Sequence, residues 1–341
     1  MGKILSTKQQ NVLEQLFQFK QKTLLKVMDN YLRQKYESDK VITTKDYIIA
    51  IGDIPVALVA HMDTVFEHPP TDIYYDTKKN IMISPQGLGA DDRAGVFAIT
   101  QILKKKFKPT IIFTTDEEKG ATGALKLTVD YPAAPTNLNY IIQLDRRGEK
   151  DCVFYDCDNT DFEKYVNSFG FETNWGSFSD ISVICPAWGV AGVNLSIGYF
   201  HEHTKQEILC IDYTLNTIDR VIAMLNDAEN SVFYKYIEAP QYTSIYGGSG
   251  KYYDYGWGYD DVNSLSYFAN HGKCKCCNKY FEIDNMYPVE TLNGEDYYCI
   301  DCLSSDKVSW CAYCGDPFIP EREGQDICND CEESILKYDK H

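Results

Sequence analysis

Residues 54–63 of the chain read IPVALVAHMD, an apolar run that ends at His61. Three further apolar runs, within residues 110–115, 140–144 and 190–198, end at or shortly before charged residues. Near-continuous runs rich in β-branched residues are typical of buried strands in a mostly parallel sheet. Because ligands of open α/β sheets bind outside the carboxyl ends of the strands, we expect the polar residues that follow these runs to converge on one crevice.

Amphipathic segments predict helices around these strands. Apolar residues recur at helical spacing over residues 8–36, which predicts one or two helices, and residues 94–106 and 211–230 are also expected to be helical. The predicted fold class is therefore α/β. A mostly parallel mixed sheet lies between helices in a three-layer core, and a small zinc-ribbon-like domain follows at the C-terminal side.

A local strand pair is predicted just before the first apolar run. Residues 47–51 are also apolar, and only Gly52 and Asp53 separate them from residues 54–60. A short connection that contains glycine between two such runs indicates a β-hairpin, which would lead directly to His61.

Residues that suit a pair of divalent metals stand at or after the predicted strands. A two-metal hydrolytic site needs a carboxylate that bridges the ions, a histidine and a carboxylate for each ion, and a separate carboxylate base. The chain contains this whole inventory, in the order His61, Asp63, Asp91, Asp92, Glu117, Glu118, Asp145 and His203. The pattern predicts a metal-dependent hydrolase.

These segments resemble the motifs of the di-zinc exopeptidase superfamily, which includes zinc aminopeptidases, tripeptidases and aminoacylases. The resemblance covers roughly residues 10–230. Its motifs are an H-x-D, a G-x-D-D, an E-E pair, an Asp after a strand and a final His. In this chain they are His61-Met62-Asp63, Gly89-Ala90-Asp91-Asp92, Glu117-Glu118, Asp145 and His203.

The resemblance implies a ligand set for two catalytic divalent metals, expected to be zinc. One zinc would be held by His61, Asp91 and Asp145. The other would be held by Asp91, Glu118 and His203. Asp91 would bridge the two ions, because a carboxylate neutralises two close cations better than a neutral ligand does.

The resemblance also assigns roles beside the metals. Glu117 is implied to be the general base, and Asp63 to orient the first zinc-bound histidine. Ser179 and Asp180 resemble a substrate-side turn, although a helix N-cap explains them equally well. His201 is a further substrate-side candidate at the rim, and the pattern H-T-x-x-E favours the histidine two residues later as the ligand.

The spacing of the motifs favours a minimal catalytic core. Residues 64–90 and 146–202 leave no room for a satellite domain of ordinary size, which argues against a carboxypeptidase-like mechanism. The expected activity is that of an aminopeptidase or small-peptide exopeptidase, in which a hydroxide bridged between two zincs attacks a peptide or small amide. One alternative is an N-acyl amino acid deacylase. Another is an inactive scaffold that acts as a protein-binding adaptor.

Domain boundaries are predicted from a change in composition. Residues 1–236 form the catalytic domain, residues 237–270 a linker rich in Gly and aromatic residues, and residues 271–335 a tandem zinc-binding module. The module contains four Cys-x-x-Cys pairs, which predict two structural zincs with sequential pairing, and interleaved pairing is the alternative. The pairs are Cys274 and Cys277, Cys299 and Cys302, Cys311 and Cys314, and Cys328 and Cys331.

Composition limits the possible partners. Of the 341 residues, 44% are hydrophobic, which is enough for a large core, and no apolar run approaches the ~18 residues of a membrane span. A formal net charge of −17 disfavours nucleic acid and anionic membranes as partners. Without an apolar signal region, the protein is expected in the cytoplasm. The cysteine-rich module is expected to contact a protein partner.

Overall fold

A computed structural model describes residues 3–228 and 231–239 and, beyond residue 270, only short stretches and single residues. The chain divides into two compact units, Met1–Tyr253 and Asp254–His341. The predicted boundaries at residues 236, 270 and 335 stay predictions, because residues 240–270 and most of the region after them lie outside the described residues.

The first unit is built on an eight-stranded mixed sheet. Its four central strands, β6, β3, β7 and β10, run parallel to one another. Antiparallel pairs add β2 and β1 at one edge and β8 at the other, where β8 pairs with β9 in parallel. In spatial order the strands are β1 (Val41–Thr43), β2 (Tyr47–Ala50), β6 (Pro109–Thr114), β3 (Ile54–His61), β7 (Tyr140–Arg146), β10 (Gly192–Ser196), β8 (Asp151–Val153) and β9 (Glu172–Thr173). The predicted mostly parallel mixed sheet is confirmed.

The predicted hairpin of residues 47–60 is wrong. β2 and β3 do not pair, because β6 lies between them and bonds antiparallel to β2 and parallel to β3. Both strands are buried on their two faces, so each accepts a neighbour from elsewhere in the chain. The chain crosses close under the start of β6 at Gly52, where a Cβ atom would lie 2.1 Å from the Lys108 carbonyl oxygen. The connection reverses the direction of the chain, but β2 and β3 stay one strand apart, and β6 occupies the position between them.

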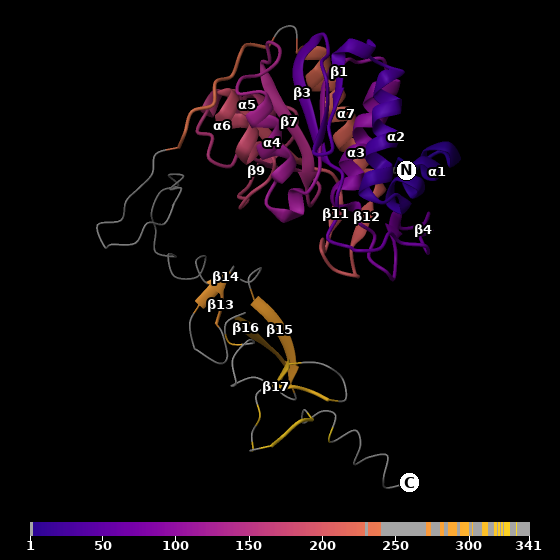
Figure 1. Cartoon of the computed structure of the whole chain (residues 1–341), viewed down its shortest axis with the longest axis vertical. Helices are drawn as coiled ribbons and strands as arrows, with labels where there is room; N and C mark the ends of the chain where they lie inside the picture. The colour runs from indigo at the N-terminus through magenta and orange to yellow at the C-terminus, as the bar shows by residue number, and fades with distance from the viewer. Residues whose placement is uncertain are drawn as a thin grey trace, which may run out of the picture. The chain divides into compact units, whose positions relative to one another are not determined.

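Helices cover both faces of this sheet (Figure 1). One face carries α1 (Thr7–Gln18), α2 (Gln21–Arg33), α3 (Ala90–Lys104), α5 (Thr160–Asn167) and α7 (Ile211–Asp227), and the other carries α4 (Thr122–Asp130) and α6 (Ile181–Trp188). Short 3-10 turns lie at Ser38–Lys40 (η1) and Glu117–Lys119 (η2). The predicted helices over residues 8–36, 94–106 and 211–230 are confirmed, the first as a pair.

Two hydrophobic cores flank the sheet. Along β3, Val56 and Leu58 pack in the core beneath α1, α2, α3 and α7, whereas Ala57 and Val59 pack in the core beneath α4 and α6. Successive side chains of a strand point to opposite faces, so a continuous apolar run fills both layers. This packing on both faces fixes the position of β3, and therefore of its last residue, relative to the helices.

A second, four-stranded antiparallel sheet lies beside the first. It consists of β11 (Tyr199–Phe200), β12 (Ile208–Cys210), β5 (Ile81–Ile83) and β4 (Tyr74–Asp76). β4 and β5 come from residues 64–90, the segment judged too short for a satellite domain. The sheet holds the loop between β11 and β12, which contains His203.

The described strands of the second unit form antiparallel hairpins. They are β13 (His271–Lys273) with β14 (Tyr280–Glu282), β15 (Met286–Thr291) with β16 (Gly294–Cys299), and β17 (Ser309–Trp310) with β18 (Pro317–Phe318). Cys302 and Cys311 are buried. Cys274, Cys277, Cys314, Cys328 and Cys331 lie outside the described residues, so the zinc-ribbon module stays a prediction.

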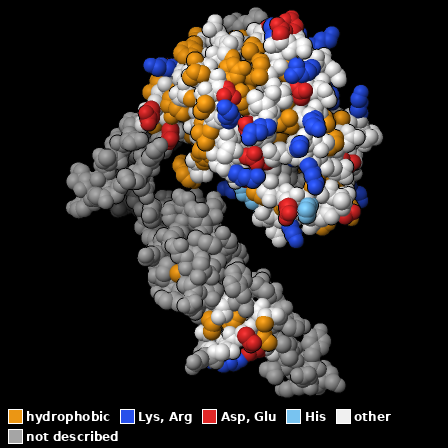
Figure 2. Space-filling view, in the orientation of Figure 1, with side chains coloured by type: hydrophobic (Ala, Val, Ile, Leu, Met, Phe, Trp, Pro, Cys, Tyr) orange, Lys and Arg blue, Asp and Glu red, His pale blue; other side chains and the backbone are white. Residues whose placement is uncertain are grey.

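No helix among the described residues is both long and apolar enough to cross a membrane. On the face of the first unit shown in Figure 2, exposed Lys and Arg side chains lie among Asp, Glu and hydrophobic side chains. The strongly acidic net charge of the sequence therefore does not make this face uniformly acidic.

Helix α3 packs unusually close to β7 at one glycine. A Cβ atom on Gly95 would lie 2.3 Å from the Leu144 carbonyl oxygen and 2.4 Å from Oδ1 of Asp92. The first of these atoms belongs to the backbone of a central strand and cannot turn away. The glycine therefore sets the distance between α3 and the end of β7.

We predict that Gly95→Ala lowers the free energy of unfolding by about 1–3 kcal/mol, the usual cost of an overpacked core. In an ordinary helix interior the same change would stabilise by about 0.5–1 kcal/mol. Urea unfolding measures the difference, with Asn226→Ala at an exposed position of α7 as the control. A Gly95→Ala protein at least as stable as the natural chain would contradict this packing.

Candidate metal centre

The predicted metal ligands come from neighbouring elements at one end of the sheet. His61 is the last residue of β3, Asp145 lies near the end of β7, and Glu118 follows β6 in η2. Asp91 stands at the start of α3, and His203 lies in the loop between β11 and β12. The carboxyl ends of parallel strands meet at the same edge, which is why these distant residues converge.

Asp91 lies at the centre of the cluster. Its Oδ1 is 3.0 Å from Nε2 of His61, and its Oδ2 is 3.2 Å from Nε2 of His203. Each histidine also faces a second carboxylate. Oδ1 of Asp145 is 3.4 Å from Nε2 of His61, and Oε1 of Glu118 is 3.2 Å from Nε2 of His203. The cluster thus consists of two halves that share Asp91.

Asp92 belongs to the support of the cluster. Its ligand atoms and those of His61 and Asp145 lie within 4.8 Å of one another, as do those of His61, Asp91 and Glu118. However, Oδ2 of Asp92 accepts a hydrogen bond from the His61 backbone N–H (3.2 Å), and its Oδ1 accepts one from the Gly95 N–H (2.9 Å). With both oxygens bonded to backbone, Asp92 is better suited to holding β3 and α3 together.

Asp63 fixes the turn that carries the two glutamates. Its Oδ1 accepts a hydrogen bond from the backbone N–H of Glu117 and its Oδ2 one from that of Glu118, each at 3.1 Å. Its Oδ1 is also 3.3 Å from Nδ1 of His61, but no residue that the structure describes gives Nδ1 a hydrogen bond of good geometry. The orienting role implied for Asp63 therefore rests on proximity, whereas its hold on η2 is direct.

Glu207 is a supporting residue that sequence reasoning missed. Its side chain is almost fully buried, its Oε2 accepts from the Gly89 N–H (2.5 Å), and its Oε1 accepts from the Asp91 N–H (3.1 Å). It ties the His203 loop to the turn that presents Asp91. The H-T-x-x-E pattern pointed to this residue, but only as a marker for choosing the ligand histidine.

The side chain of Asp145 is held by a hydrogen-bond network. Its Oδ2 accepts from Oγ of Ser179 (2.8 Å) and from Nε2 of Gln143 (3.1 Å), and its Oδ1 from the hydroxyl of Tyr199 (3.2 Å). Its backbone N–H donates to Oδ1 of Asn194 (2.9 Å). Ser179 thus hydrogen-bonds directly to Asp145, which is one of the predicted metal ligands. Gln143, Asn194 and Tyr199 carried no sequence signal, because isolated polar residues of this kind are common.

The other two substrate-side candidates differ in position. Asp180 is fully buried, and one of its oxygens accepts a hydrogen bond from Oγ1 of Thr114 (2.5 Å). It is the N-cap residue of α6, but its side chain makes no capping hydrogen bond. His201 is exposed, and its carbonyl oxygen accepts from Oγ1 of Thr204 (2.7 Å). Of these two residues, Asp180 is buried and His201 is exposed to solvent.

Burial and mutual repulsion shift the titration of the clustered carboxyl groups. Burial, together with neighbouring carboxylates, raises the pKa of Glu117 to about 9, that of Asp180 to about 7 and that of Asp145 to about 6. The carboxylates of Asp91 and Glu118, each 3.2 Å from its Nε2 atom, raise the pKa of His203 to about 11. These values describe the protein groups alone. Divalent cations among the carboxylates would lower the pKa of each acid.

The arrangement fits divalent metals. The Oε1 atom of Glu118 is buried, and no described residue gives it a well-aligned hydrogen bond, although Nε2 of His203 lies 3.2 Å away. A buried oxygen in this state is expected where a cation binds. The His61 side chain is 1% exposed and that of His203 is 51% exposed, so the cluster reaches solvent on the side of His203. These buried His, Asp and Glu groups are consistent with one or more catalytic metals.

Comparison with known proteins supports the fold. No protein-family model matches the sequence, and no curated protein matches it. Among solved structures, aminopeptidase PepT from Bacillus cereus matches with a TM-score of 0.54 at 15% identity, over 66% of this chain and 99% of that protein. A tripeptidase from Staphylococcus aureus matches with a TM-score of 0.53 at 13% identity, over 67% and 100%. An aminopeptidase from the archaeon Desulfurococcus kamchatkensis matches with a TM-score of 0.52 at 12% identity, over 64% and 95%. About two thirds of the chain therefore shares the α/β fold of these peptidases.

Proposed function

We propose that the first unit is a metal-dependent exopeptidase, an aminopeptidase that acts on short peptides and uses two divalent metals, with zinc the expected ion. The observation that carries this proposal is the position of Asp91. Its two oxygens face two different histidines, at 3.0 and 3.2 Å, and each histidine faces a further carboxylate. A carboxylate in this position is suited to bridging two cations, and the halves supply one histidine and one carboxylate for each.

The protein residues divide into two ligand sets. His61, Asp91 and Asp145 would hold one ion, and Asp91, Glu118 and His203 the other. When bound, the metals would supply Lewis-acid activation of the scissile carbonyl and would make water acidic enough to be deprotonated near neutral pH. Asp92 and Glu207 hold the Asp91 turn in place through backbone N–H groups, which limits the movement of the shared ligand.

Glu117 is the proposed general base. It belongs to neither ligand set, and the hydrogen bond from its backbone to Asp63 fixes the turn on which it stands. Its raised pKa in the protein alone reflects burial first and nearby carboxylates after that, so neighbouring cations would return it to the ionised form. Ionised Glu117 would accept a proton from the attacking water and transfer it to the leaving amine.

The second unit is proposed to hold two structural zincs and to contact a protein partner. The support is the spacing of its four Cys-x-x-Cys pairs, together with the burial of Cys302 and Cys311. Metal analysis of the whole chain distinguishes the two classes of site, because loss of Asp91 would leave the cysteine-bound ions in place.

The role of Glu117 predicts a loss of turnover without a loss of metal. Glu117→Gln keeps the size of the side chain and removes the base, so kcat should fall by at least ~10²-fold. Metal content, measured by mass spectrometry on the same sample, should equal that of the natural protein. Full activity in this variant would remove Glu117 from the mechanism.

The neighbouring aspartates give a matched pair for the metal site. Asp91→Asn should release the catalytic metals, because the shared ligand loses its charge. Asp92→Asn should retain them and lower stability by about 1 kcal/mol, since one of two hydrogen bonds from backbone N–H groups is lost. Metal titration and urea unfolding of both variants decide the assignment. The reverse pattern would make Asp92 the ligand.

The polarity of attack is tested with substrate pairs that differ only at the N-terminus. We expect a dipeptide or tripeptide with a free amino group to be cleaved by the metal-loaded protein, and its N-acetylated counterpart to resist. Release of amino acids is followed by chromatography, with Glu117→Gln as the blank. Preferential cleavage of the acetyl group itself would instead favour the N-acyl amino acid deacylase. No cleavage of any substrate by a metal-loaded protein would favour the adaptor.

A further inference from the structure

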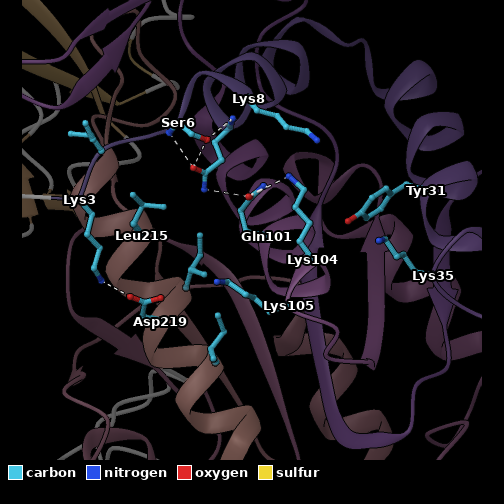
Figure 3. A pocket seen from close by; sticks show the side chains of 14 residues that line it. Lys3, Ser6, Lys8, Tyr31, Lys35, Gln101, Lys104, Lys105, Leu215 and Asp219 are labelled. Carbon is cyan, nitrogen blue, oxygen red and sulfur yellow. Dashed lines mark hydrogen bonds and ion pairs between the residues drawn. The ribbon is translucent and has the colours of Figure 1, made fainter.

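A groove of about 780 Å³ lies on the first unit, away from the metal centre (Figure 3). Its walls come from the residues before and within α1, from the end of α2, from the last turn of α3 and from one side of α7. Asp91 stands at the first turn of α3, and Lys104 is the last residue of that helix. At 1.5 Å per residue, the length of the helix separates the groove from the metal centre by roughly 16–20 Å.

The groove gathers positive charge in an acidic protein. Lys8, Lys35, Lys104 and Lys105 line it, and none of these four has an ion-pair partner among the residues that the structure describes. The one acidic residue in the lining, Asp219, is paired with Lys3 at 2.5 Å. With a formal charge of −17 on the whole chain, acidic side chains are plentiful, yet the lining contains five lysines and a single acid.

The ammonium groups lie close enough to influence one another. Burial lowers the pKa of Lys104, and the charges of Lys8 and Lys35 lower it further. Nζ of Lys104 donates to Oε1 of Gln101 at 3.3 Å, and Nζ of Lys35 lies 5.6 Å from the centre of the Tyr31 ring. Figure 3 shows these side chains along one side of the groove. An anion placed among them would relieve their repulsion.

The opposite side of the groove is apolar apart from the pair formed by Asp219 and Lys3. Leu215, Ile218 and Ile222 follow one another along α7 at intervals of three and four residues, so they form one stripe on the helix. Ile4 also lines the groove and is 67% exposed. A ligand that satisfies both sides must carry a negative charge at one end and apolar surface along its length.

We propose that this groove binds a small amphiphilic anion, a carboxylate attached to an aliphatic chain. The carboxylate lies among Lys8, Lys35 and Lys104, and the chain lies along the stripe on α7. The volume falls in the range of small-molecule sites, about 300–1,000 Å³. A membrane surface would reach the lysines but would not fill a concave site, and nucleic acid would leave the apolar stripe uncovered.

Titration calorimetry of the full chain with octanoate tests the proposal. We expect saturable binding of octanoate, and no binding of octylammonium or octanol at the same concentrations. Hexanoate should bind about 15-fold more weakly, because each methylene removed from the stripe costs about fourfold in affinity. Absence of saturable binding, equal binding of the cation, or affinity independent of chain length would overturn the proposal.

Two double variants with the same change in net charge locate the site. Lys104→Gln with Lys105→Gln should weaken octanoate binding by about tenfold. Lys78→Gln with Lys79→Gln, at an exposed turn outside the groove, should leave it unchanged. Both variants should keep the metal content of the natural protein. Equal affinities in the two variants would refute this site, and so would binding to vesicles of anionic lipid by a chain that ignores free octanoate.

Discussion

The concentration of carboxylates around His61 is the constraint on which the candidate metal centre depends. Buried acids repel one another and lose hydration, and either effect alone raises the pKa of a carboxyl group. The shifts at Glu117, Asp145 and Asp180 show both effects. An arrangement of this kind would be disfavoured in a structural core. It becomes favourable when cations occupy the centre, which is why the cluster itself argues for metal binding.

The acidic residues of the cluster have two different structural roles. Asp63, Asp92 and Glu207 are bonded to backbone N–H groups of neighbouring segments, so their charges are compensated by the peptide chain and they tie the loops together. Asp91 and Glu118 direct oxygens toward histidine side chains. The supporting acids thus hold the ligand-bearing segments in place even though these segments come from separate strands.

Sequence reasoning located the ends of the buried strands, where an apolar run stops beside a charged residue. His61, Glu118 and Asp145 follow apolar runs that form buried strands, and strands buried on both faces are typical of parallel sheets. It failed where a strand or side chain pairs with a residue that is distant in the sequence. The pairing of β2 with β6 depends on a strand that lies far along the chain, and local turn chemistry around Gly52 carries no information about it. Glu207 was passed over for the same reason, because its partners at Gly89 and Asp91 are more than a hundred residues away.

Asp91 and Asp92 show how adjacent, identical residues acquire different functions. Both have non-helical backbone angles at the start of α3, so their side chains are free of the angular spacing that a regular helix imposes. One carboxylate faces the two histidines, and the other receives the N–H groups of His61 and Gly95. The close approach of Gly95 to β7 completes this arrangement, since a larger residue would push the start of α3 away from the strand that carries Asp145. The distance between Asp91 and its neighbours therefore depends on the absence of a side chain at Gly95, one helical turn from Asp91.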